Sequence, residues 1–227
     1  MRKIIFFCVL ALNVHAQDAD KLVKDIRTKL AQVNDYKATG KLKTDVSFLK
    51  IPVSDIQVYY KKPDRFKVKK DGGISLLPKG GVSVNLNSLM MMDKVTAVSA
   101  GESVFQGVKV RVVKLLPLDE NSDLILTTLY IDADRLLIYK SVTTTRDNGT
   151  YDMQMIYGRY EKYGLPDKVI FSFNTKDYKL PKGVTFEYEA GEKPQQTQDA
   201  LKNKKGKVEI TYSAYAINQG LSEAVFK

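Results

Sequence analysis

The stretch Asp18–Gly40, DADKLVKDIRTKLAQVNDYKATG, decides the fold because the spacing of its apolar residues changes within it. In its first half, Leu22, Ile26 and Leu30 recur at the spacing of an amphipathic helix with one apolar face. From Tyr36 onward, apolar and polar residues alternate, which is the spacing of a β-strand with one buried face. The stretch therefore predicts one N-terminal helix followed directly by a sheet.

Alternation with a period of two continues along the chain, for example at Phe66 and Val68 and again at Phe171 and Phe173. Short turn sequences such as Lys62-Pro63-Asp64 separate the runs, and connections this short join antiparallel neighbours. Because a large open sheet is stable only when it curls, the single helix is the element that can cover its concave side. The sequence predicts a mainly β fold: an incomplete curled antiparallel β-barrel of about ten strands, with the N-terminal helix as plug or lid.

Residues 1–16 have the features of a secretory signal. Two basic residues precede an apolar run over Ile4–Val14, and a small-residue cleavage site ends at Ala16. The run of roughly eleven residues is too short to cross a bilayer, which takes about twenty. We therefore expect export, cleavage of the signal peptide after Ala16, and a single domain over residues 17–227.

The only histidine and the only cysteine, His15 and Cys8, both lie inside this signal. The exported chain would have neither imidazole nor thiol, which supply most activating bases, many nucleophiles and most zinc or haem ligands. Hydrolysis by a carboxylate pair needs no histidine, but the carboxylates fall mostly at turns or on polar strand faces. We therefore predict a protein that is not an enzyme, with no catalytic residues, no cofactor and no metal site.

The formal net charge is +10 at pH 7, and Arg2 and Lys3 of the signal supply two of these charges. One interpretation is that the remaining excess only solvates the polar faces of the sheet. The other is attraction to anionic lipid headgroups. Nucleic acid is not an expected partner, because the basic residues are spread along strands and no nucleic-acid-binding motif is present.

Several short motifs follow one another in a characteristic order. The helix ends at Val33-Asn34, and a later strand closes on Tyr60–Lys67, YKKPDRFK. Further along come Phe105–Val110, FQGVKV, then Leu129–Asp132, LYID, and Leu180–Val184, LPKGV. This order resembles that of the periplasmic outer-membrane lipoprotein carrier and sorting family, the Lol type, also called LolA-like.

The resemblance implies a periplasmic protein whose helical lid closes an incomplete barrel that holds lipoprotein acyl chains. It also implies an inner-membrane transporter and an outer-membrane acceptor as partners, and we expect a monomer. In close relatives, an arginine before the proline of the early turn helps to fasten the lid. That position is Lys62 here, and lysine lacks the planar fork of arginine, so Arg65 is the alternative lid latch.

A soluble carrier must hide nearly all of its cargo, because one sixteen-carbon chain left in water costs on the order of 12 kcal/mol. The candidate lid or flap residues lie on the helix and in a glycine-flanked segment, which could instead be a packed hairpin tip: Leu22, Ile26, Leu30, Ile74, Leu76 and Leu77. The candidate lipid-binding residues, each of which could also be an ordinary core residue, lie on apolar strand faces or in a methionine run: Ile56, Val58, Phe66, Val68, Val84, Leu86, Met90, Met91 and Met92.

These features predict a periplasmic carrier, a transport chaperone that sequesters lipoprotein acyl chains or other lipids in an apolar cavity for transfer to the outer membrane. No covalent chemistry is involved. The alternative is a non-enzymatic structural or interaction module of the cell envelope, built on the same sheet with a filled core. The space beneath the helix distinguishes the two: an open cavity there indicates the carrier, whereas helix and sheet side chains that interdigitate without space count against the carrier and favour the module.

Overall fold

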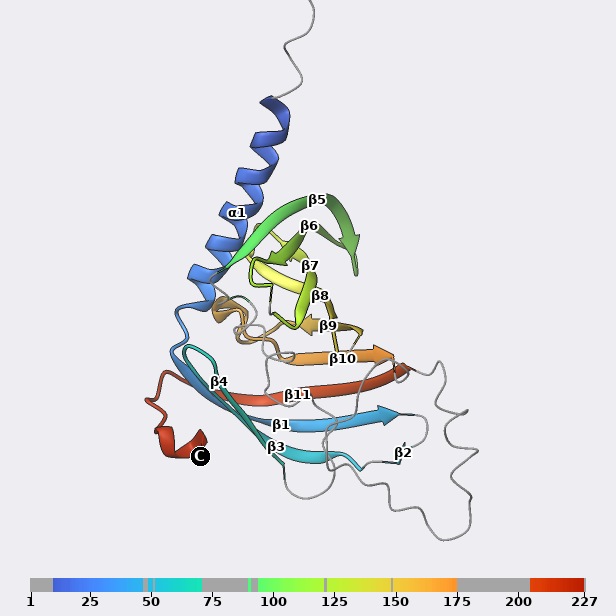
Figure 1. Ribbon diagram of the computed structural model, residues 1–227. Coiled ribbons are helices and arrows are strands. Elements are labelled where there is room, and N and C mark those ends of the chain that lie inside the picture. Colours follow the sequence, from blue (N-terminus) through green and yellow to red (C-terminus); the bar gives the residue numbers. More distant parts are fainter. Residues whose placement is uncertain are drawn as a thin grey trace, which may run out of the picture.

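The computed structural model describes residues 10–46, 49–50, 52–70, 90, 94–120, 122–147, 149–174 and 205–226. One long helix precedes a single, strongly curved antiparallel sheet (Figure 1). The sheet is not closed, so the predicted incomplete curled barrel with an N-terminal helix is confirmed. In the described part of the chain, no helix is both long enough and apolar enough to cross a membrane.

The helix α1 spans Leu10–Leu30, and two short 3-10 helices, η1 at Glu161–Tyr163 and η2 at Glu223–Phe226, come later. The strands are β1 Asp35–Val46, β2 Leu49–Lys50, β3 Ser54–Lys61, β4 Arg65–Lys70, β5 Val95–Phe105, β6 Val108–Pro117, β7 Leu124–Asp132, β8 Leu137–Thr145, β9 Thr150–Ile156, β10 Lys168–Asn174 and β11 Lys205–Ile217.

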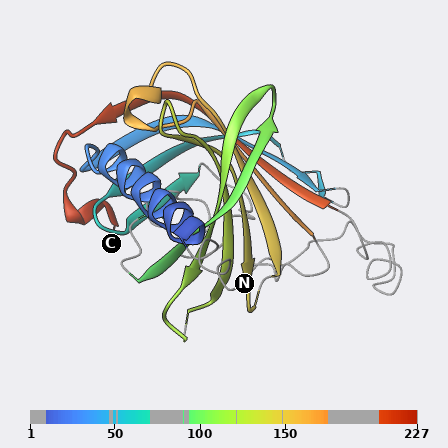
Figure 2. The same cartoon turned by 90° about the horizontal axis from the view of Figure 1, so that it is seen from above.

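The strand order is β4-β3-β1-β11-β10-β9-β8-β7-β6-β5, and β2 pairs with β1 beside this path. Hairpin connections account for most neighbours, as short turns in the sequence predict. The pair β1 and β11 instead joins the first long strand to the last one. The strands β4 and β5 lie at the two ends of this order and, among the described residues, do not pair with each other, and Figure 2 shows how far the sheet curls between them.

The core lies on the concave face of the sheet, hereafter the inner face. The apolar stripe of α1, which includes Leu22, Ile26 and Leu30, is buried there in one cluster with side chains of the sheet. The helix backbone runs closest to β5, and Figure 2 shows α1 crossing the concave side of the curled sheet. Because strand residues alternate between faces, the opposite face of the sheet is the outer, polar one.

The helix begins at Leu10 and continues without a break past Ala16, where we expect the signal to be cleaved. Cleavage stays a prediction. It would remove only the first part of α1, and the buried stripe that the structure describes runs from Ala19 to Leu30. The shortened helix would therefore keep all of this described stripe.

One glycine allows two strands to approach closely. Gly40 lies on β1 at a register shift of the β1–β11 pair, directly after Thr39. A Cβ atom placed on Gly40 would lie 2.4 Å from the carbonyl oxygen of Thr211. Because that oxygen belongs to the backbone of the neighbouring strand, it cannot move aside as a side chain could.

We therefore expect Gly40→Ala to lower the free energy of unfolding by about 1–3 kcal/mol, since the added methyl group forces β1 and β11 apart. Urea denaturation measures this change. The matched control is Thr39→Ala, at an exposed neighbouring position, which should change stability by less than about 0.5 kcal/mol. A Gly40→Ala protein as stable as the parent would contradict the close approach.

Candidate functional site

The described candidate lining residues gather at one end of the inner face. Ile56 and Val58 on β3 are buried, and Val58 pairs across the strands with Val68 on β4. Phe66 and Val68 are only partly buried and pack against the same core, which also contains Met90. The remaining predicted lining residues lie outside the described residues: Val84, Leu86, Met91 and Met92.

The predicted lid residues of the helix face this surface. Leu22, Ile26 and Leu30 are each 5% exposed or less and belong to the core cluster that contains the β3 residues. Their side chains therefore cover the inner face, which is what a plug or lid must do. The flap residues Ile74, Leu76 and Leu77 lie outside the described residues.

A larger apolar surface comes from the later strands, which the sequence prediction of the site did not include. Tyr151 on β9 and Phe171 on β10 have ring centroids 5.2 Å apart, and Phe173 lies 5.5 Å from Phe171. Together with β11, these strands continue the inner face beyond β3 and β4 with methionine and branched side chains: Met153 and Met155 on β9, Val169 on β10, and Val208 and Ile210 on β11. Their alternation with polar residues was the signal that could have placed them in the site.

The inner face also carries buried hydroxyl groups. Thr127 on β7 and Thr143 on β8 pair across the strands, with their Oγ1 atoms 3.2 Å apart. Thr143 and Ser141 lie opposite Tyr151 and Met153 of β9, so they share the face of the core residues. The inner face is therefore not purely apolar, because hydroxyls interrupt it on β7 and β8.

The described inner face is tightly closed in this conformation. Val58, Tyr60, Met90 and Leu129 have no solvent-accessible surface, so no space large enough for water adjoins them. The apolar stripe of α1 shares their cluster. Around these side chains the structure is that of a filled core, which is the arrangement expected of the module and not the open cavity expected of a carrier. A ligand could reach them only if a covering segment moved.

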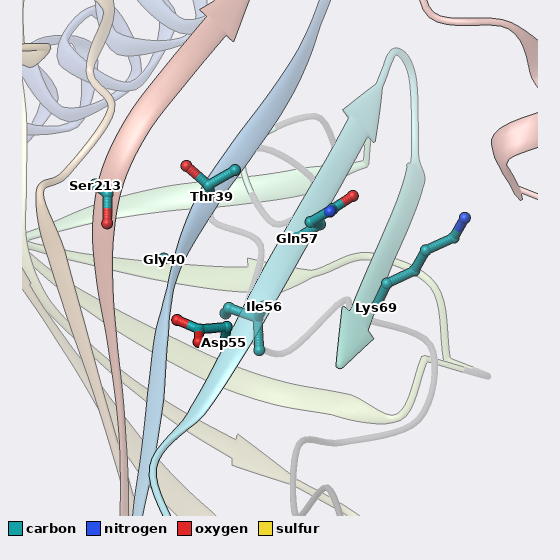
Figure 3. A pocket seen from close by; sticks show the side chains of 7 residues that line it. All are labelled: Thr39, Gly40, Asp55, Ile56, Gln57, Lys69 and Ser213. Carbon is teal, nitrogen blue, oxygen red and sulfur yellow. The ribbon is translucent and has the colours of Figure 1, made fainter. Parts of the chain in front are cut away.

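A pocket of about 230 Å³ lies on the other side of the sheet. Figure 3 shows Thr39, Gln57 and Lys69 on three neighbouring strands at this pocket. These residues pair across β1, β3 and β4 on the outer face, where the side chains are exposed. The polar lining does not suit an acyl chain, and nothing in the sequence pattern indicated a pocket here. Its lining residues are Thr39, Gly40, Asp55, Ile56, Gln57, Lys69 and Ser213.

The predicted latch position Lys62 contacts the chain just after α1. Its Nζ donates a hydrogen bond to Asn34 Oδ1 at 3.1 Å and another to the carbonyl oxygen of Ala31. The alternative latch residue, Arg65, lies elsewhere, with its Nε 3.8 Å from a carboxylate oxygen of Glu223 in η2. Of the two candidates, Lys62 is thus the one placed at the C-terminal end of the helix.

Asn218, which follows β11, binds the same link between α1 and β1. Its Oδ1 accepts a hydrogen bond from the backbone N–H of Asn34 at 2.7 Å, and its Nδ2 donates to the carbonyl oxygen of Gln32 at 2.9 Å. The Asp35 carboxylate accepts hydrogen bonds from the backbone N–H groups of Gln219 and Gly220, at 2.9 and 3.0 Å. These contacts fix the point from which α1 leaves the sheet.

One ion pair joins the other end of the buried helical stripe to the sheet. Arg111 on β6 donates two hydrogen bonds to the Asp18 carboxylate, one of them from Nη1 to Oδ1 at 3.0 Å. Such bidentate pairs are directional. The side chains of Asp18 and Arg111 are 46% and 31% exposed, so water can compete for both. If Ala16 is the cleavage site, Asp18 lies in the first turn of the shortened helix, where a carboxylate also favours the helix dipole.

The turn between β7 and β8 holds the helix as well. Lys29 Nζ donates a hydrogen bond to the carbonyl oxygen of Arg135 at 2.7 Å, and partial burial lowers the pKa of Lys29. The turn itself is organised by Asp132, whose Oδ2 accepts from Arg135 Nε at 2.7 Å and whose Oδ1 accepts two backbone N–H bonds. Burial alone would raise the pKa of Asp132, but these hydrogen bonds and the Arg135 charge hold it below its usual value.

Comparison with known proteins places this geometry in a known fold. No protein-family model matches the chain, and no curated protein sequence matches it either. Solved structures do match: a LolA superfamily protein from Nitrosomonas europaea is 10% identical, with a TM-score of 0.58 over 92% of this chain and 97% of that one.

Two further structures agree. An outer membrane lipoprotein-sorting protein domain from Vibrio parahaemolyticus is 14% identical, with a TM-score of 0.56 over 93% of this chain and 97% of that one. A DUF1329 family protein from Desulfovibrio piger is 12% identical, with a TM-score of 0.57 over 94% of this chain and 97% of that one. The chain therefore has a LolA-like fold, and the resemblance inferred from the sequence is confirmed at the level of the fold.

The lowered pKa of Asp132 makes its contribution to stability dependent on pH. A depressed carboxyl pKa stabilises the fold above the unfolded value of about 3.9, and this contribution is lost as the pH falls through the folded pKa. We expect Asp132→Asn to reduce the free energy of unfolding by about 1–2 kcal/mol at pH 7 and to have little effect below the folded pKa.

Urea denaturation across this pH range measures the difference between the parent and Asp132→Asn. Asp134→Asn, an exposed position in the same turn, is the matched control and should give the same stability as the parent at each pH. A constant difference between the parent and Asp132→Asn at all pH values would contradict the assigned role of the carboxylate.

Proposed function

We propose that the protein is a periplasmic lipid carrier in which acyl chains of lipoproteins or related lipids bind the inner face in place of α1. The observation that carries the proposal is the way in which α1 covers the inner face. The apolar stripe of the helix forms a separate layer over the concave face, and polar contacts tie the layer to the sheet at both ends. The LolA-like fold supports the same function, because the Vibrio parahaemolyticus structure is described as lipoprotein-sorting.

The energies of such an exchange are nearly balanced. Displacing Leu22, Val23, Ile26 and Leu30 from the inner face would cost roughly 6–12 kcal/mol, at about 1.5–3 kcal/mol for each side chain. One sixteen-carbon chain that enters in their place recovers on the order of 12 kcal/mol. A cargo chain can therefore replace the helix without leaving the inner face exposed to water, and the empty protein can close again on its own helix.

The two ends of the helix differ in how firmly they are held. At the C-terminal end, Lys62, Asn218 and Asp35 bind the link between α1 and β1 through several hydrogen bonds. At the other end, Asp18 and Arg111 form a partly exposed pair, and pairs of this kind contribute only about 0–1 kcal/mol. The helix would therefore open from the Asp18 end and pivot about its C-terminal end.

The proposed setting is the periplasm, reached after cleavage behind Ala16, with the domain formed by residues 17–227. An inner-membrane transporter would load this monomeric carrier, and an outer-membrane acceptor would receive the cargo. The protein would carry out no covalent chemistry. Intact mass measurement of the protein purified from the cell envelope tests the first step, and a mass that includes residues 1–16 would contradict cleavage.

The filled-core module remains a second candidate because of one observation. Val58, Tyr60 and Leu129 have no accessible surface at all, as expected for side chains that never leave a permanent core. In a structural module, the helix would stay in place and no lipid would accompany the protein. Native mass spectrometry of the protein from its own envelope separates the two, because only a carrier shows a mass increment that matches an acylated species.

We expect Val68→Glu to weaken lipid loading by more than tenfold, because burial of a carboxylate against an acyl chain costs several kcal/mol. Val68 suits this test because it lies on the inner face of the edge strand β4 and is only partly buried, so the fold tolerates a change. Displacement of an apolar dye by lipid measures loading. Thermal unfolding reports whether each variant is folded.

Lys67→Glu is the matched control, since residue 67 is the neighbouring position on the opposite face of β4 and pairs with Tyr59. It introduces the same carboxylate and should leave loading unchanged. Equal losses in Val68→Glu and Lys67→Glu would contradict the assignment of the inner face as the lipid-binding surface.

A reversible cross-link tests whether the helix must move. We expect the mature protein with Asp18→Cys and Arg111→Cys, joined by a thiol-cleavable bismaleimide, to lose dye and lipid loading, and to regain it on reduction. The exported chain would have no other cysteine, so the linker reacts only at these positions. Asp18→Cys alone, treated in the same way, is the control and should load normally. Full loading of the cross-linked protein would exclude displacement of α1.

A further inference from the structure

The outer face of the sheet carries an excess of lysine over part of its width. The strands concerned are β4, β3, β1, β11 and β10, which are consecutive neighbours in the sheet. The cross-strand pairs place one set of side chains on this face, hereafter the lysine face. Its lysines with described side chains are Lys37, Lys41, Lys43, Lys61, Lys67, Lys69, Lys168 and Lys207, Arg65 adds one further cation, and its carboxylates are Asp35, Asp45, Asp55 and Glu209.

The carboxylates neutralise only part of this charge. Asp55 Oδ1 lies 3.2 Å from Lys41 Nζ. Glu209 contacts Lys207 and lies 3.1 Å from Lys168 Nζ, and the hydrogen bond from Lys207 is the largest cause of the lowered pKa of Glu209. Glu209 is therefore ionised at neutral pH but is shared between two lysines. The excess positive charge remains toward β4 and β1, where Lys37, Lys43 and Lys69 are exposed.

Two of these ammonium groups lie near the same tyrosine ring, one from β1 and one from β4, the two strands that flank β3. Lys37 Nζ is 5.8 Å and Lys69 Nζ 5.4 Å from the ring centroid of Tyr59, which is only 7% exposed. The ring attracts both cations and so helps to hold two like charges near each other on the same surface. This arrangement concentrates positive charge at the centre of the lysine face.

The pocket of about 230 Å³ adjoins the same place. Lys69, Gln57 and Thr39 follow one another across β4, β3 and β1, and Figure 3 shows them side by side at the pocket. Ammonium, amide and hydroxyl groups are donors that phosphate oxygens accept. The lysine face thus combines exposed ammonium groups with a pocket whose lining is mostly polar. Ile56, which is buried, is the one branched apolar residue among the residues that line the pocket.

We propose that the lysine face docks the protein on the surface of an anionic phospholipid bilayer. Neighbouring strands lie about 4.8 Å apart, so Lys37 and Lys67, which lie on either side of Tyr59 and two strands apart, are separated by roughly 10 Å along the sheet. Several lysines can therefore reach a plane of headgroup phosphates together. Each lysine held near such a surface strengthens binding by roughly 5-fold, and salt screens the attraction. This docking goes beyond the carrier function and needs no cargo, because it uses the face opposite the core.

The test is co-sedimentation of the mature protein with vesicles of phosphatidylglycerol mixed with phosphatidylcholine, and with vesicles of phosphatidylcholine alone. We expect binding only to the anionic vesicles and a loss of binding at high salt. The triple variant Lys37→Gln, Lys43→Gln and Lys69→Gln should bind roughly 100-fold more weakly.

The matched control removes the same charge elsewhere. Lys94, Lys114 and Lys162 are exposed and lie outside the lysine face, so their replacement by Gln should weaken binding by less than about 5-fold. Thermal unfolding should show that both triple variants are folded. Both should also load the apolar dye equally, which separates docking on the bilayer from binding of lipid cargo.

Three results would overturn the proposal. Equal weakening by the two triple variants would show that net charge alone drives binding. Equal binding to phosphatidylcholine vesicles would show that anionic lipid is not required. Loss of vesicle binding in inorganic phosphate, but not in chloride of the same ionic strength, would show that the pocket takes free phosphate instead of docking a bilayer.

Discussion

The structure depends on the burial of one apolar surface by a single helix. Within the part of the chain that the structure describes, the end strands β4 and β5 of the curled sheet do not pair, and no second sheet covers its concave face. The stripe of α1 supplies that cover, and because it belongs to a separate layer, its removal breaks no strand pairing. The hydrophobic effect therefore holds the molecule together and also defines the surface that another apolar chain could occupy.

Periodicity made the fold and part of this surface predictable. The helical spacing of Leu22, Ile26 and Leu30 and the alternation at Ile56 and Val58 both encode burial on one face, and the structure buries all five. Such patterns report which face is apolar but not which strands meet. For that reason the candidate site was limited to the early strands, and the aromatic surface of β9 and β10 was not assigned to it.

Polar contacts between distant segments could not be derived in this way. The pair of Asp18 and Arg111 joins residues far apart in sequence, and each of them alone resembles an ordinary exposed charge. Lys62 was found only because of its place in a family motif, and its contact with Asn34 has no pattern of its own. Likewise, the pocket at Gly40 lies beside a register shift, and a register shift depends on the paired strand and not on local sequence alone.

The pairing of β1 with β11 limits the order in which the strands of the sheet can form. Between these adjacent strands lies nearly the whole polypeptide, so the middle of the sheet cannot form until the last strand has been delivered. Contacts of such long range are slow to form. A chain that crosses a membrane from its N-terminus would thus complete its sheet only after its last strand has reached the far side.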